Sequence, residues 1–472
     1  MKNIKKLIVL PAILLAFFTG EAQVIKSYSI NMHFFPKDAQ MWGYPVSNTH
    51  FARGNAKITF SEITQDSLVF YLHGEFKIDS VLSGQHSISF DSEKVFYDKD
   101  YSYVGLKTMI NSQDVKTHRS VVVYYSGFMH PSKARSLSNY MHINKETGVF
   151  LRAYHYSPWF PVFENSGEDN YQAEFDNITI KLPAGFRAIV SGKRNHENND
   201  SVNYTVSWQP GVSKIMNLQC TARKFKTISK NGIFVYYIND AAIASSILQY
   251  TDTLKTLYNN TFKTQPNSAN LHILEMPKYG NISSQNVVGI SHSVYKHFDD
   301  NLYSRLTIAH ELVHPYVAVP VKKSNPFYCF VVEGFPAFFH LYGLHHTSDD
   351  FNLEAYMHKI ETQYLTKKRT GKSPRGRSLP PEKPILEISH NEIGRYKDKF
   401  ILPDRSRLFL YDMWQNMGDE KFEVFLNQLF NSDHLDYNSF ETLVTRFVPE
   451  YKDNLNTWLN TNAYPDEFHL QD

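Results

Sequence analysis

The sequence predicts a multidomain protein with an antiparallel all-β part over residues 23–226, followed by an α+β, mostly helical part over residues 227–472. The chain has 472 residues, more than one hydrophobic core usually organises. Apolar and polar residues alternate through the first part, whereas the second part contains longer segments with helical spacing. Hydrophobic residues make up 42% of the chain, so both parts can bury a core.

The first 22 residues have the pattern of a signal peptide. Lys2, Lys5 and Lys6 form a basic start, residues 7–18 are apolar, and Gly20-Glu21-Ala22 offers a cleavage site between small residues. The apolar stretch is shorter than the about 20 residues that a membrane-spanning helix needs. We therefore expect an exported protein, periplasmic or extracellular, whose mature chain begins near residue 23 and contains no transmembrane segment.

The β part is predicted from period-two alternation and from runs of β-branched and aromatic residues. Residues 28–34 alternate as in a half-buried strand, and residues 68–72 and 121–125 are typical of a sheet interior. Polar turn residues at 198–201 separate two further stretches. These features together indicate antiparallel sheets.

The second part mixes one clear strand with several helices. Its predicted strand covers residues 271–276. Its predicted helices cover residues 241–262, 302–314, 331–344, 407–415 and 421–430.

Charge and cysteine content exclude several classes of protein. The formal net charge is +2, too small to imply a nucleic acid partner. Cys220 and Cys329 are the two cysteines, too few for a disulfide framework and spaced unlike any Cys-based zinc motif. Buried free thiols are favoured, and a single bridge between them remains open.

A metal-binding motif lies in the predicted helix 302–314. His310 and His314 are four residues apart, so both imidazoles lie on one helix face and can reach one Zn²⁺. Glu333 follows after eighteen intervening residues and completes a His₂Glu set with an open fourth position. Glu311 stands between the histidines, placed as a general base for a zinc-bound water. Pro315 is expected to kink or end the helix directly after the second histidine.

The HExxH-x18-E spacing resembles the M1 family of zinc metallopeptidases, the gluzincins similar to aminopeptidase N. Residues 159–165 look like the FPCFDEP segment of that family, and residues 418–422 and 458–465 resemble the last helices of its catalytic domain. The resemblance implies a saddle-shaped β domain beside a thermolysin-like catalytic domain that binds one Zn²⁺ and hydrolyses peptides or proteins. It also implies a short form, because the chain ends before the helical C-terminal domain that many members carry.

The resemblance leaves the oxyanion-stabilising group open. The tyrosine that the family uses falls on Leu402 or Pro403 when counted back from Gly418. Tyr396 lies slightly upstream, and Arg405 offers a guanidinium that can stabilise an oxyanion. Both are candidate catalytic residues.

The substrate-binding motifs also differ from the family. The GxMEN strand is matched to residues 283–289, with Gln285 in place of the glutamate that binds a free α-amine, followed by Asn286 and Gly289. The Gln-x-Glu pair of the β domain falls on Phe150 and Arg152. An amide and a cation thus replace two acids, and a cation repels an N-terminal amine. The strand can still pair with an extended peptide backbone.

Three hypotheses follow. The first is an exported zinc metallopeptidase with altered recognition of the N-terminal amine. The second is a peptide- or envelope-binding protein that keeps zinc but has little or no turnover. The third is a zinc hydrolase of a non-peptide amide or epoxide. The sequence leaves the oligomeric state undetermined.

Overall fold

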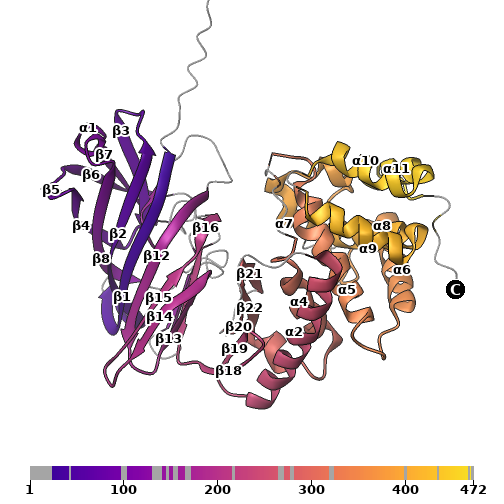
Figure 1. Ribbon diagram of the computed structural model, residues 1–472, viewed down its shortest axis with the longest axis horizontal. Helices are drawn as coiled ribbons and strands as arrows, with labels where there is room; N and C mark the ends of the chain where they lie inside the picture. The colour runs from indigo at the N-terminus through magenta and orange to yellow at the C-terminus, as the bar shows by residue number, and fades with distance from the viewer. Residues whose placement is uncertain are drawn as a thin grey trace, which may run out of the picture.

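The computed structural model describes residues 24–41, 44–96, 104–129, 141–144, 148–152, 158–164, 172–214, 218–263, 270–276, 281–317, 321, 324–397, 401–432, 435–465 and 468. The expected signal peptide, residues 1–22, lies outside them. Within the described residues, an N-terminal part made of strands is followed by a part that is mostly helical (Figure 1). This division confirms the predicted fold class.

The largest sheet of the β part has the strand order β14-β15-β12-β1-β2-β8-β4-β5, with β16 also paired to β12. In chain order its strands are β1 (Val24–Met41), β2 (Tyr44–Glu62), β4 (Phe76–Ser83), β5 (His86–Ser87), β8 (Ser120–Met129), β12 (Gln172–Pro183), β14 (Lys193–Asn199), β15 (Asn203–Gln209) and β16 (Gly211–Lys214). The pairing is antiparallel except between β1 and β12, which run parallel. The wholly antiparallel sheet expected from the sequence is corrected at this one pair.

Two smaller sheets complete the β part, with the strand orders β13-β17-β10-β9 and β11-β3-β7-β6. The first contains β9 (Met141–Asn144), β10 (Gly148–Arg152), β13 (Arg187–Val190) and β17 (Gln219–Arg223). The second contains β3 (Ser67–His73), β6 (Phe90–Phe96), β7 (Val104–Asn111) and β11 (Val162–Phe163). A short helix, α1 (Gln113–Lys116), precedes β8.

Alternation decides which face of each strand is buried. In β1 the residues Tyr28, Ile30, Met32 and Phe34 are all buried, while the intervening residues are exposed or half-buried. Burial of every second side chain is what a pleated strand with one covered face requires. The same core takes in Trp159 and the other buried aromatic residues of the 159–163 segment.

The second part is built on a sheet with the order β18-β19-β20-β22-β21. Its strands are β18 (Lys226–Lys230), β19 (Ile233–Tyr237), β20 (Leu271–Met276), β21 (Ile282–Ser284) and β22 (Val287–Ser291). Its helices are α2 (Ala241–Phe262), α3 (His292–Lys296), α4 (Leu302–Val313), α5 (Phe335–His345), α6 (Leu353–Thr370), α7 (Ile393–Lys397), α8 (Ile401–Met417), α9 (Asp419–Phe430), α10 (Tyr437–Phe447) and α11 (Lys452–Asn460). The sheet lies between the β part and the helices (Figure 1).

The predicted elements of this part are observed with small changes at their ends. Helix α2 and strand β20 have the predicted bounds, and α8 and α9 extend the predicted helices 407–415 and 421–430. Cys220 and Cys329 are buried and unbridged, and burial raises the pKa of each thiol to about 12. No helix in the described residues combines the length and the apolar character that a membrane span requires.

The two parts meet where the turn between β21 and β22 contacts the β part. The Asn286 side chain accepts a hydrogen bond from the backbone N–H of Gly192 at 2.8 Å and donates to the carbonyl of the same residue at 2.9 Å. The hydroxyls of Ser191 and Ser284 lie 3.1 Å apart. These buried polar contacts fix the edge of the second sheet to the first part.

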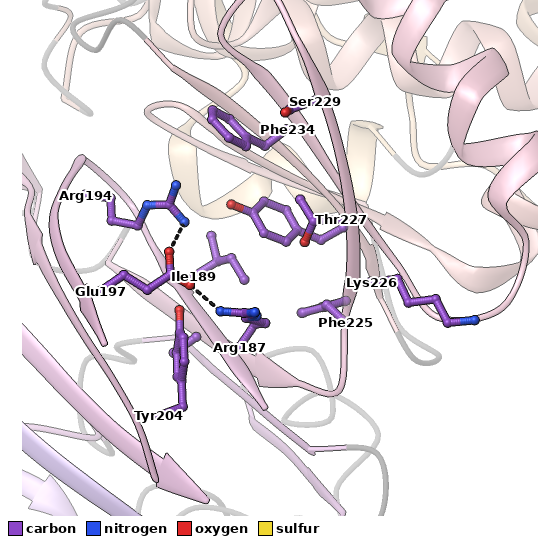
Figure 2. A pocket seen from close by; sticks show the side chains of 12 residues that line it. Arg187, Ile189, Arg194, Glu197, Tyr204, Phe225, Lys226, Thr227, Ser229 and Phe234 are labelled. Carbon is purple, nitrogen blue, oxygen red and sulfur yellow. Dashed lines mark hydrogen bonds and ion pairs between the residues drawn. The ribbon is translucent and has the colours of Figure 1, made fainter. Parts of the chain in front are cut away.

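A cavity of about 370 Å³ opens at the same junction, between β13, β14 and β15 on one side and β18 and β19 on the other (Figure 2). Arg187 and Arg194 both pair with Glu197, and the Arg194 bond is 2.7 Å long. The Arg194 guanidinium also lies over the ring of Phe234, 5.5 Å from its centroid. The charged groups of this cavity are thus engaged with one another, and they connect β14 to β19.

Candidate metal centre

Helix α4 carries both histidines of the motif. Asn301 caps its N-terminus by accepting a hydrogen bond from the backbone N–H of Tyr303 at 2.9 Å. The side of the helix with Leu306, Ala309 and Leu312 packs into the core, which fixes the rotation of the helix about its axis. His310 and His314 are consequently held in half-buried positions.

The helix ends directly after the metal motif. Its last residue is Val313, and His314 keeps helical backbone angles at the C-cap. Pro315 follows and cannot donate a backbone hydrogen bond, as predicted. The second histidine therefore keeps its place one turn below the first.

Glu333 lies in a π-helical turn, Phe330–Gly334, that leads into α5. Such turns shift the side chains of a helix relative to regular α-helical spacing and are frequent at functional sites. Gly334 is required here, because a Cβ would lie 2.6 Å from the Phe330 ring and 2.7 Å from the Ser406 hydroxyl. Close approach of α8 thus supports the turn that presents Glu333.

The structure brings the three predicted ligands together. His310, His314 and Glu333 each offer a ligand atom, and these atoms all lie within 4.8 Å of one another. His310 Nε2 and Glu333 Oε2 are 3.5 Å apart, close to the separation of two atoms bound to one Zn²⁺ at about 2 Å each. Two imidazoles and one carboxylate are also a donor set that zinc prefers. The residues fit the metal.

Glu311 lies beside this group. Its Oε2 is 4.0 Å from His314 Nε2, and the residue is buried within α4. The Glu311 carboxylate thus lies next to the group formed by His310, His314 and Glu333, and its role as a base stays a prediction.

His340 is a site residue that the sequence did not reveal. It lies on α5, and its Nδ1 is 3.4 Å from the Nδ1 of His310. Burial first, and then the charge of Arg407, hold the pKa of His340 well below its usual range. A weak signal existed, since His340 follows Glu333 by seven residues and so shares its helix face.

Arg405 does not take the predicted catalytic role. The residue is 0% exposed, and its guanidinium donates to the carbonyls of Trp458, Thr457, Thr461 and Ala463. It also donates to the Tyr364 hydroxyl and pairs with Glu382 at 3.0 Å. A side chain whose donors are used inside the helical part cannot stabilise an oxyanion on a substrate. Its observed role is to join α6, α8 and α11.

Tyr396 is also placed away from a catalytic role. It is 1% exposed, and its hydroxyl donates to the Pro381 carbonyl at 3.1 Å. The family position at Leu402 and Pro403 lies inside helix α8. Neither candidate from the sequence therefore offers an accessible group to an oxyanion.

The predicted substrate-binding residues of the second sheet lie in the turn after β21 and on β22. Gln285 and Asn286 form the turn between β21 and β22, where Gln285 has a positive φ of 49° and donates to the Val212 carbonyl. Asn286 is buried in the junction described above. Gly289 lies on β22, paired with Leu274 on one side and Ile282 on the other, so its backbone has no free edge. These residues hold the sheet in place.

Among the described strands, β21 and β18 are the two edges of this sheet, and β21 contains Ile282, Ser283 and Ser284 and no acidic residue. This strand contacts the metal-binding helix α4. Arg152 is the last residue of β10, where it pairs in register with Gln219.

Comparisons with known proteins give a likeness in structure alone. No protein-family model matches the sequence, and no curated protein is similar to it. The M1 zinc metallopeptidase of Deinococcus radiodurans is 14% identical with a TM-score of 0.65, over 94% of this chain and 96% of that one. A mutant of that enzyme bound to a Tyr-Ser-Ala substrate aligns at 12% identity with the same TM-score, over 94% of this chain and 96% of that one.

Yeast LTA4 hydrolase in complex with bestatin is 14% identical with a TM-score of 0.66, over 96% of this chain and 70% of that one. At these identities the alignments establish architecture, and they extend over both parts of the chain. Together with the order of the sheets and helices, they show that this protein has the two-domain fold of the M1 zinc metallopeptidases.

Proposed function

We propose that this protein is an exported, zinc-dependent metallopeptidase, with a signal peptide at residues 1–22, a β domain at 23–226 and a thermolysin-like catalytic domain at 227–472. The observation that carries the proposal is the convergence of His310, His314 and Glu333, with Glu311 beside them. A structural role does not require two imidazoles and two carboxylates at one half-buried place. Zinc hydrolysis does.

The proposed chemistry assigns a task to each of these side chains. Zn²⁺ bound here would lower the pKa of a coordinated water and polarise the scissile carbonyl. His310, His314 and Glu333 would hold the metal. Glu311 takes the proton of the attacking water on its carboxylate and passes it to the nitrogen of the leaving amine.

Recognition of the substrate is proposed to differ from that of an aminopeptidase. The edge strand β21 contacts α4 and can pair with an extended peptide backbone. Its side chains include no carboxylate to bind a free α-amine. We therefore assign a peptide or protein substrate without assigning a requirement for a free N-terminus.

One observation favours a second candidate, a zinc-retaining peptide- or envelope-binding protein with little turnover. Tyr396 and Arg405 are both buried and engaged elsewhere, so neither stabilises the oxyanion of a tetrahedral intermediate. Loss of one oxyanion donor typically lowers kcat by about 10²–10³-fold.

The two candidates are distinguished by incubating zinc-loaded protein with a mixed peptide library and mapping the cut sites by mass spectrometry. The metallopeptidase proposal predicts cleavage by the wild type and a loss of about 10²–10⁴-fold in Glu311→Gln, the usual contribution of a general base. Zinc content should be equal in both proteins. Zinc binding without any cleavage would establish the binding protein instead, and equal cleavage by Glu311→Gln would remove Glu311 from the mechanism.

A further inference from the structure

The cavity at the junction of the two parts has walls from both of them. Strands β18 and β19 form an antiparallel ribbon, and directly opposed residues of such a ribbon share one face. Two opposed pairs of this ribbon line the cavity, Thr227 with Tyr236 and Ser229 with Phe234. Strands β13, β14 and β15 supply the other wall (Figure 2). A molecule in this cavity would therefore touch both parts of the chain.

A β-bulge brings two charged residues of β14 to the same side. Arg194 and Glu197 are three positions apart, so on a regular strand their side chains would point to opposite faces. The pairing of β14 with β15 shifts its register between Arg194 and His196. A bulge inserts one extra residue and redirects the side chains that follow it. Both side chains consequently line the cavity, where a salt bridge of 2.7 Å joins them.

The charges inside the cavity do not balance. Arg187 and Arg194 each bind Glu197 through one guanidinium nitrogen, so two positive charges share one carboxylate. A guanidinium has five N–H donors, and among the described residues Arg194 has no second hydrogen-bond acceptor. The two arginine side chains are 35% and 29% exposed, so an entering molecule can reach their remaining donors. Lys226 also borders the cavity, but its side chain points away from it (Figure 2).

Aromatic side chains surround these donors. Tyr204, Phe225 and Tyr236 are buried, and the Arg187 guanidinium lies over the Tyr204 ring, 5.1 Å from its centroid. A guanidinium that lies over a ring still has its N–H donors in its own plane. A concave, largely apolar place with a few polar groups between two domains is typical of small-molecule sites of about 300–1,000 Å³. This cavity, at about 370 Å³, falls within that range.

We propose that this cavity binds a small organic anion with one carboxylate and a flat apolar body, such as an aromatic acid. The carboxylate accepts hydrogen bonds from Arg187 and Arg194, since the planar guanidinium matches the geometry of a carboxylate. The apolar body lies against the rings of Phe234 and Tyr236. The second positive charge of the cavity is then compensated.

This site is separate from the metal centre, and the inference does not rest on the proposed zinc function. The cavity borders β18 and β19, at one edge of the second sheet. The metal-binding helix α4 contacts β21 and β22, at the other edge. Binding in the cavity can thus be measured independently of cleavage.

Three small molecules test which features the cavity recognises. Benzoate has both the carboxylate and the flat body, benzamide has the same shape without the charge, and inorganic phosphate has the charge without the body. Ligand-observed NMR titrations of the zinc-loaded protein give the three dissociation constants. Benzoate should bind at least about tenfold more tightly than either of the others, as expected when charged hydrogen bonds and ring contacts act together. Equal binding of benzamide, equal binding of phosphate, or no binding of benzoate would each overturn the proposal.

Two variants within the ion-pair group should change benzoate affinity in opposite directions. Arg194→Gln removes a charged donor and should weaken binding about tenfold or more. Glu197→Gln removes the carboxylate that competes for both guanidiniums and repels the ligand, so it should tighten binding about tenfold. Arg446→Gln is the matched control, because Arg446 also lies over a ring, that of Phe447 on α10, but outside the cavity. It should leave benzoate affinity unchanged.

The opposite signs separate binding in the cavity from other effects. General destabilisation does not tighten binding, and benzoate bound at the metal centre would respond to neither variant. Unchanged or weaker benzoate binding in Glu197→Gln would therefore overturn the inference. If Arg194→Gln does not fold by circular dichroism, Glu197→Gln still decides the matter. Cleavage of the peptide library is measured separately, so loss of one proposal leaves the other in place.

Discussion

Arg405 shows how one side chain can hold several helices together. Its guanidinium bonds to four backbone carbonyls of the C-terminal segment, to a tyrosine and to Glu382. Charged donors form the stronger hydrogen bonds in proteins, and the planar guanidinium can bind several acceptors at once.

Arg405→Leu should therefore destabilise the protein by about 3–5 kcal/mol, because four backbone carbonyls lose a buried charged donor and Glu382 loses one of its two cationic partners. Urea unfolding measures the change in free energy. Turnover per folded molecule should stay within a factor of a few, since Arg405 does not touch substrate. Arg395→Leu, an exposed arginine on α7, is the control and should change stability by less than about 0.5 kcal/mol. A stable but inactive Arg405→Leu would restore a catalytic role.

The same residues show what could be predicted from the sequence and why. His310 and His314 could be paired because helix geometry converts a four-residue spacing directly into position, whereas Glu333 was predicted from the spacing of the whole motif. The roles of Gln285 and Gly289 stay predictions, because a position in a turn or on a strand does not by itself identify a substrate contact. His340 and the partners of Arg405 depend on packing between helices, which local spacing does not specify.

At the scale of elements, the predicted bounds agree best with the structure where a long periodic segment has a capping residue at each end. Asp240 and Lys263 flank α2 as its N-cap and its left-handed C-cap, and the predicted bounds held. The parallel pairing of β1 with β12 was missed, because partners far apart in the chain leave no local pattern. The π-helical turn at Glu333 was missed for a similar reason, since it depends on Ser406 of α8 packing against Gly334.

The junction between β15 and the second sheet contains a residue that makes stability depend on pH. The ring of His272 packs edge to face against Trp208, with centroids 5.1 Å apart. Burial, and then the charge of Arg194, lower the pKa of His272 to about 3. The unfolded chain takes up a proton at this residue near pH 6.5, whereas the folded chain does not. The stability that the neutral ring contributes is therefore present above about pH 6.5 and is lost as the pH falls toward 3.

As the pH falls from about 6 to about 4, protonation of His272 in the unfolded chain should lower the free energy of unfolding by about 1 kcal/mol per pH unit. His272→Leu should show a correspondingly shallower loss of unfolding free energy over that range. Chemical denaturation of both proteins at several pH values measures the two slopes. Parallel slopes would mean that His272 is protonated in the folded protein or is not the group responsible.

For the whole molecule, Zn²⁺ that binds the folded state should stabilise both parts of the chain. At a free concentration a hundredfold above the dissociation constant, the gain is about 2.7 kcal/mol. Removal of the metal with a chelator should lower the midpoint of thermal unfolding, and added Zn²⁺ should restore it. Glu333→Gln, which lacks one ligand, should respond far less to the chelator. An identical midpoint with and without metal would contradict zinc binding by the native state.

The sequence predicted two parts and their order, but the way they join was visible only in the structure. Four residues of the second part, Tyr236, Leu274, Met276 and Val287, belong to the hydrophobic core of the first. In the sequence they look like ordinary residues of a buried strand. The rest of that core comes mainly from strands of the other sheets, so no local pattern identifies them.

This shared core limits how freely the two halves can be recombined during evolution. Met276 packs against the core of the β part, and its side chain also occupies the space beside Gly289, where a Cβ would lie 2.9 Å from Met276 Cγ. A substitution there acts on both halves at once. Replacing the β part with that of a distant relative would therefore require matching changes in the residues of β20 and β22 that belong to the shared core. These two strands lie next to β21, the edge strand that contacts the metal-binding helix α4.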